Sequence, residues 1–219
     1  PYTTLFRSVG ASATLIPAAA VIVSGTGTMT GTGTVQVTRT IAAPTFNAQY
    51  TVTTKTLTNL TVEYAGAAAQ EVTNAQTYPL LKINNASGVT VTTGNVTVST
   101  LLTLTSGNIT TAAFVLISTA TCASSVTRVS GHVIGSFRKT VPAGASACTF
   151  EVGSGSNYTP AVLGLAAGTG AGTITAGTTG TSHPTPTGSS FSVTNYLNRY
   201  WTLTNTTAAP AAGTTASFN

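Results

Sequence analysis

Runs of residues in which every second side chain is aliphatic recur in the middle of this chain at intervals of about 21 residues. They begin at Leu60, Leu81 and Leu102, and each is followed by a Gly or Asn turn and further alternation. Period-two alternation is typical of a β-strand with one buried face, and a repeat of about 20–50 residues is typical of stacked coils. The pattern therefore predicts a parallel β-solenoid, in which each coil packs on the preceding one.

A β-meander of hairpins is the alternative arrangement for the same strands. Hairpins with tight two-residue turns favour shorter intervals between strands. We therefore favour parallel β-helix or solenoid coils for residues 9–128.

The pattern changes after about residue 129. Strand-like runs are found at 133–139, 148–152, 161–165, 173–176 and 199–205, with Pro, Gly and Ser turns between them. Spacing of roughly 8–15 residues predicts an antiparallel β-sandwich-like module at 129–219, truncated at its C-terminus. Residues 177–190, which include Pro184 and Pro186, are expected to form an exposed connection.

The N-terminal part contains three further segments to interpret. Residues 1–8 look like the translation of a common short-read sequencing adapter, so we expect an artefact at the start of a metagenomic fragment. The apolar stretch 15–23 is too short to cross a membrane and contains Pro17, so it predicts a strand. Gly–Thr alternation at 25–37 also predicts strand with turns or bulges, because no helix follows to hold a nucleotide phosphate.

Composition narrows the classes of function. Hydrophobic residues make up 42% of the chain, which disfavours disorder, and charged residues only 5%. We therefore expect threonine and asparagine to cover the solvent face. The net charge is +5, but only Arg138 and Lys139 are adjacent among the basic residues, so the sequence lacks the basic stripe of a nucleic-acid-binding protein.

Few residues are available for catalysis. Aspartate is absent, and the acidic residues are Glu63, Glu71 and Glu151. Glycoside hydrolysis usually needs two carboxylates across the bond, and calcium sites need several. His132 and His183 lie without an acidic residue or a nucleophile elbow next to them in the sequence. We predict no catalytic residue, no cofactor-binding residue and no metal ligand.

Four residues are candidates for structural or binding roles. Cys122 and Cys148 are the only cysteines, and they are either a disulfide or two buried thiols. Trp201 is interpreted as a core anchor of the second module. Carbohydrate stacking by Trp201 and Tyr200 is the alternative.

The order of motifs resembles the β-strand-repeat surface proteins of Gram-negative bacteria with type IX secretion. The segments that carry the resemblance are 55–62, 81–91, 102–111, 137–141, 150–153, 157–160 and 198–204. The resemblance implies a large secreted protein, either an adhesin or an element of the surface layer. This sequence departs from the pattern at Cys122 and Cys148, and it lacks the C-terminal sorting domain.

The leading hypothesis is a non-catalytic, structural or adhesive segment of a bacterial surface protein, whose partners are extracellular polysaccharide or other cell-surface components. The alternative is a ligand-binding solenoid that recognises ice or a polysaccharide surface through its threonines, although Lys82 interrupts the threonine pattern. A polysaccharide-degrading β-helix enzyme is a third hypothesis, which the shortage of acidic residues disfavours.

Overall fold

The computed structural model describes residues 8–184, 198–206 and 209–219. The predicted adapter segment therefore lies outside the described residues, apart from Ser8, as does part of the predicted 177–190 connection. In chain order the elements are β1 (Thr14–Leu15), β2 (Thr28–Met29), β3 (Thr34–Val37), α1 (Phe46–Gln49), β4 (Thr54–Lys55), β5 (Thr61–Tyr64), β6 (Gln70–Val72), β7 (Tyr78–Asn84), β8 (Val89–Val91), β9 (Val96–Ser106), β10 (Ile109–Thr121), β11 (Val126–Arg128), β12 (Val133–Val141), β13 (Ser146–Phe150), β14 (Val152–Ser154), β15 (Asn157–Tyr158), β16 (Ala161–Leu165), β17 (Gly172–Thr179), β18 (Tyr200–Asn205) and β19 (Thr215–Phe218).

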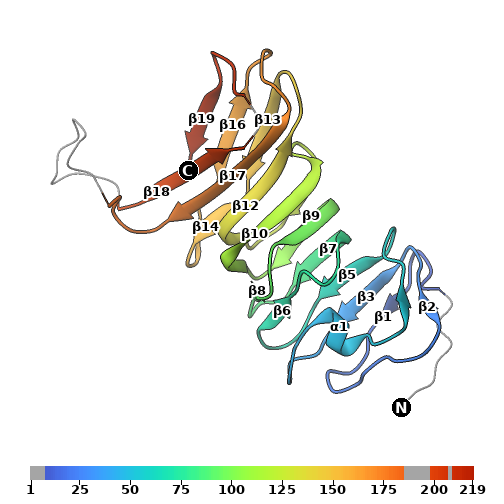
Figure 1. The fold of residues 1–219 in the computed structure, drawn as a ribbon. Helices are drawn as coiled ribbons and strands as arrows, with labels where there is room; N and C mark the ends of the chain where they lie inside the picture. The colour runs from blue at the N-terminus through green and yellow to red at the C-terminus, as the bar shows by residue number, and fades with distance from the viewer. Residues whose placement is uncertain (1–7, 185–197, 207–208) are drawn as a thin grey trace.

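The predicted fold class is confirmed: the chain is nearly all β and forms a β-solenoid of about seven turns that continues into antiparallel sheets. Figure 1 shows the coils stacked along one long axis, with β1 near one end and β18 and β19 at the other. In the described part of the chain, no helix has the length and apolarity of a membrane span.

Parallel pairing stacks aliphatic side chains into continuous inner rows. One row contains Leu15, Val35, Val62, Leu81, Leu102 and Val126. A second contains Val89, Ile109, Val133 and Val152, beginning from Gln70. The central members of both rows are buried. Removal of this apolar surface from water, worth roughly 25 cal/mol per Å², is the main force that holds the coils together.

The first step of the register differs from the repeat in the sequence. Leu81 pairs with Leu102 as predicted, but its partner on the other side is Val62 rather than Leu60. A shift of two residues leaves the same face of the strand inside, whereas a shift of one would have turned every side chain over. The aliphatic row is therefore continuous although the coils differ in length.

The prediction of a strand at 15–23 was wrong over most of its length. Only Thr14–Leu15 is a strand, with an isolated bridge between Val23 and Tyr50. Pro17 lacks a backbone donor, and the following residues turn, with the Val21 N–H donating to the Ala18 carbonyl at 2.9 Å. The stretch 25–37 was predicted as strand with turns or bulges, and it holds two short strands, β2 and β3, with bends at 26–27 and 32–33.

A one-turn helix that was not predicted from the sequence contributes buried side chains to the N-terminal coils. The Thr45 side chain caps α1 by accepting a hydrogen bond from Ala48 N. Phe46 and Tyr50 are fully buried, and the ring centroid of Phe46 lies 6.3 Å from that of Tyr78. Tertiary packing forms this helix, because a single turn is not stable alone.

Parallel pairing continues beyond residue 128. Strand β12 pairs parallel with β10, and β14 pairs parallel with β12. The boundary predicted at 128 therefore falls inside the solenoid. The antiparallel part consists of β17 and β18, which extend the sheet from β12, and of a separate sheet β13–β16–β19.

Candidate functional site

Glu63 belongs to a polar row on the strand face opposite the aliphatic row, and its side chain is nevertheless buried. Its row partners are Gln36 and Lys82 on the neighbouring strands. Oε2 accepts a hydrogen bond from Gln36 Nε2 at 3.0 Å, Oε1 accepts one from Asn84 Nδ2 at 2.9 Å, and Lys82 Nζ lies 3.0 Å from Oε1. Burial by itself raises the pKa of Glu63, but these donors outweigh it and hold the pKa below its usual value.

Glu151 is the partner of a buried lysine. Lys139 occupies an inward position on β12 and is fully buried, with Nζ 2.7 Å from Glu151 Oε2. Nζ also donates to the Thr149 carbonyl at 2.7 Å and lies 5.0 Å from the centroid of the Phe137 ring. Burial lowers the pKa of Lys139, and the negative charge of Glu151 opposes that shift.

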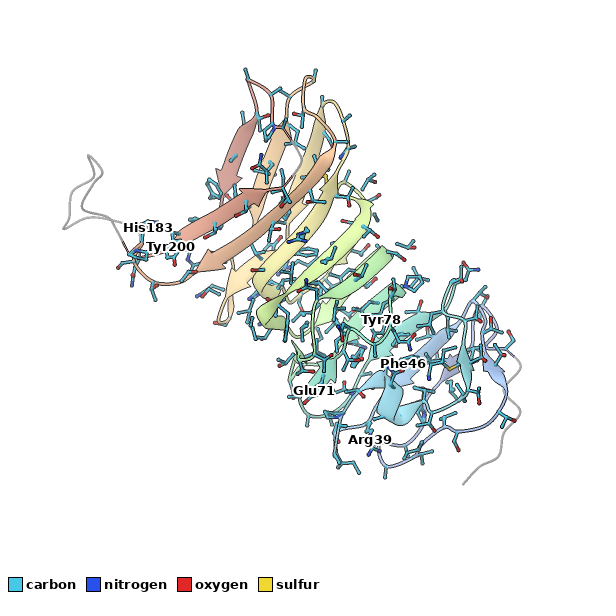
Figure 2. All side chains as sticks on the ribbon, in the orientation of Figure 1. Arg39, Phe46, Glu71, Tyr78, His183 and Tyr200 are labelled. Carbon is cyan, nitrogen blue, oxygen red and sulfur yellow. A yellow bond between two sulfur atoms is a disulfide. The ribbon has the colours of Figure 1, made fainter. Side chains whose placement is uncertain are left out.

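The three glutamates interact with different polar groups. Glu71 on β6 accepts a hydrogen bond from the Thr92 hydroxyl at 3.4 Å, and Figure 2 shows it on the N-terminal half of the solenoid. Among the described residues, no two glutamates share a polar partner. The arrangement offers structural partners for the carboxylates and not a pair facing across a bond.

The two histidines occupy different environments. His132 is buried at a coil corner, with Nε2 3.1 Å from the Gly155 carbonyl oxygen. Burial lowers the pKa of His132, the Gly155 carbonyl opposes this shift, and the positive charge of Arg128 adds to it. His183 packs edge-on against Tyr200, with ring centroids 5.0 Å apart, at the tip where β17 and β18 end (Figure 2). Across the described ranges, no three His, Cys, Asp or Glu side chains gather as metal ligands would.

Cys122 and Cys148 form a disulfide, which decides between the two states that the sequence left open. Cys122 directly follows β10 of the solenoid, and Cys148 lies on β13 of the antiparallel sheet. The bond therefore ties the last coils to the antiparallel part.

Tyr200 and Trp201 point to opposite sides of the same sheet. Trp201 pairs with Thr178, donates from Nε1 to the Thr159 carbonyl at 3.0 Å, and packs against Phe218 with centroids 5.0 Å apart. Trp201 is partly buried and packs against the core on the inner side of this sheet. Tyr200 pairs with Thr179, which places it on the outer face.

A groove opens on that outer face, beside the end of the β12–β17 ladder. Their ladder ends at the Phe137–Ala176 pair, and beyond it β12 turns to pair with β14. The groove has a volume of about 240 Å³. Its lining residues are Gly135, Ser136, Thr175, Ala176, Gly177, Thr178, Thr179, Thr202 and Thr204.

Charge and an aromatic ring stand at the two ends of this groove, which we call the threonine groove. Arg138 pairs with Thr175 and donates from Nε to its hydroxyl at 3.1 Å. Tyr200 lies at the other end, across from Thr179. Arg138 and the groove threonines were not predicted as site residues from the sequence, although Thr173-x-Thr175 and Thr202-x-Thr204 alternate and so could have been assigned to one exposed face.

Comparison with known proteins provides no assignment for this site. The chain matches no protein-family model, no curated protein and no solved structure.

Proposed function

We propose that this chain is a non-catalytic, structural or adhesive segment of a large secreted bacterial surface protein, of the β-strand-repeat kind associated with type IX secretion. The observation that carries the proposal is the stack of parallel coils, whose inner rows are aliphatic and whose glutamates each have a separate polar partner. A stack of this kind suits a spacer, because each coil contacts only its neighbours and length is gained by adding coils.

The disulfide supports an extracellular setting. Disulfides persist in oxidising compartments and are rare where thiol reductants are abundant. The bond between Cys122 and Cys148 is nearly inaccessible to solvent, with 4% and 0% of these residues exposed. A buried disulfide with a structural position fits a protein that functions outside the cell.

Antibodies against the purified chain test the location. We expect them to label intact cells of the organism that encodes the protein, and surface protease treatment to remove the signal. Labelling that needs permeabilised cells would contradict the proposal.

A polysaccharide screen tests the absence of catalysis. Incubation of the chain with pectin, alginate and chitin is expected to release no reducing ends and no unsaturated products. Any product that disappears in Glu63→Gln, Glu71→Gln or Glu151→Gln would overturn the non-catalytic assignment.

In the outer rows of the solenoid, threonines stack over short runs such as Thr14, Thr34 and Thr61, which are too short for an extended ice-binding face. An ice-binding face would require threonine above threonine from coil to coil, but Thr61 pairs with Leu80, and Glu63 pairs with Lys82. We expect no thermal hysteresis from the purified chain.

A further inference from the structure

We infer that the threonine groove binds a short oligosaccharide that contains an acidic sugar. The inference rests on the proposed adhesive role for its biological setting and names the class of ligand. The lining of the groove supplies hydroxyl groups, and the neighbours of its two end residues supply an aromatic ring, Tyr200 beside Thr179, and a cation, Arg138 beside Thr175.

Hydroxyl groups line most of the groove. Five lining residues carry one on the outer face: Ser136, Thr175, Thr179, Thr202 and Thr204. A hydroxyl both donates and accepts, so a row of hydroxyls can match the hydroxyls of a sugar in more than one orientation. Thr202 and Thr204 are exposed, which leaves their side chains accessible to a ligand.

The two ends of the groove differ in chemistry, so a bound ligand would have a preferred direction. Tyr200 offers an apolar ring with a polar tip, suited to the C–H face of a sugar, and His183 packs edge-on against that ring. Arg138 stands at the Thr175 end, held there by its Nε hydrogen bond to Thr175. A guanidinium recognises a carboxylate through paired hydrogen bonds.

Length and charge favour an acidic oligosaccharide over a single sugar. Tyr200 and Thr204 are four residues apart on β18, which corresponds to roughly 13 Å along a strand. None of the described residues that line the groove carries a carboxylate, and the net charge of +5 attracts a polyanion at long range.

Titration of the ¹⁵N-labelled chain with tetragalacturonate, and with cellotetraose as an uncharged probe, tests the inference. We expect tetragalacturonate to shift amide resonances of β17 and β18 and to bind about tenfold more tightly than cellotetraose, since one charge-assisted bond is worth about that factor. Absence of binding by tetragalacturonate would overturn the inference without affecting the antibody test of location.

Substitutions in the groove test which side chains contact the ligand. Thr202→Val with Thr204→Val keeps the branched shape and removes two hydroxyls, so binding should weaken about tenfold. Arg138→Gln should reduce tetragalacturonate affinity to that of cellotetraose. The matched control is Thr103→Val with Thr127→Val, a cross-strand pair on β9 and β11 of the solenoid, and it should bind as the parent chain does.

Two results would contradict the site. One is equal weakening by the control pair and the groove pair. The other is binding of a single-stranded oligonucleotide as tight as that of tetragalacturonate and insensitive to Arg138→Gln, because the chain would then act as a general polyanion binder.

Discussion

Arg138 and Lys139 are adjacent in the sequence but lie in opposite environments. Alternation along β12 puts Arg138 on the outer face beside Thr175 and Lys139 inside the solenoid. A buried ammonium group is costly unless it is paired and hydrogen-bonded. Glu151 and the Thr149 carbonyl meet that requirement, and Glu151 supplies the opposite charge.

Removal of one member of this pair should destabilise the protein strongly. Glu151→Leu leaves Lys139 buried without its partner, and we expect the free energy of unfolding to fall by about 3–5 kcal/mol in urea titrations. Lys139→Met with Glu151→Leu should recover most of that loss, because neither charge remains. Arg138→Met is the neighbouring control and should cost about 1 kcal/mol or less. A double variant no more stable than Glu151→Leu would contradict this account.

The environment of Glu63 predicts that the free energy of unfolding depends on pH in the acidic range. The donors around its carboxylate lower its folded-state pKa below the usual 4.5, so the ionised form stabilises the fold. This contribution is complete above the unfolded pKa and is lost as pH falls through the lowered folded value.

Unfolding free energies measured from pH 7 down to pH 3 should therefore fall less steeply for Glu63→Gln than for the parent chain. Gln36→Leu, which removes one donor, should give an intermediate slope. Identical slopes for parent and Glu63→Gln would refute the assignment.

At the scale of the element, glycines determine how closely the coils stack at one corner. Gly107 and Gly131 have φ of 78° and 76°, and a Cβ at either would overlap a backbone carbonyl of the preceding coil, Asn85 for Gly107 and Gly107 for Gly131. Only glycine satisfies both the left-handed backbone and the close approach.

Gly107→Ala is expected to lower the free energy of unfolding by on the order of 3 kcal/mol, through backbone strain and the overlap with Asn85. Gly155→Ala is a matched control, because Gly155 has φ of 59° but open space around its Cβ position. It should cost only the backbone term, about 1–2 kcal/mol. Equal losses in chemical denaturation would show that stacking at this corner is not tight.

At the scale of the whole molecule, the disulfide joins two kinds of β architecture. Parallel coils continue through β14, while β13 lies in the antiparallel sheet with β16 and β19. Cys122 and Cys148 are 26 residues apart, and the bond closes the segment that contains β11 and β12. Its main effect is therefore to fix the antiparallel sheet to the end of the solenoid.

Reduction should affect the two ends of the molecule differently. We expect a reductant to lower the free energy of unfolding by about 3–4 kcal/mol in the chain-entropy account of a loop this size. Hydrogen exchange should accelerate in β13, β16 and β19 while β5, β7 and β9 stay protected. Cys122→Ala with Cys148→Ala should behave like the reduced chain and not respond to reductant. Uniform acceleration along the solenoid would contradict a local role.

Much of the fold could be predicted from the sequence, because alternation with a period of two assigns every aliphatic side chain of a strand to one face. Val62, Leu81 and Leu102 therefore all face inward. The strand 161–165 was predicted with its observed bounds for the same reason. The alternation within a strand depends on local chemistry, which the sequence contains in full.

Only the tertiary structure decided which strands became neighbours. Contacts between coils of unequal length determine four features. These are the partner of Lys139, the left-handed corner at Gly107, the helix at Phe46 and the point where the β12–β17 ladder ends. Tyr200 and Trp201 illustrate this for the candidate site: they are adjacent in the sequence, but Tyr200 lies on the sheet face that carries the threonine groove and Trp201 packs against the core on the other face. The alternation of residues along a strand decides which face each side chain lies on. Which residues it contacts there is decided only when the coils stack.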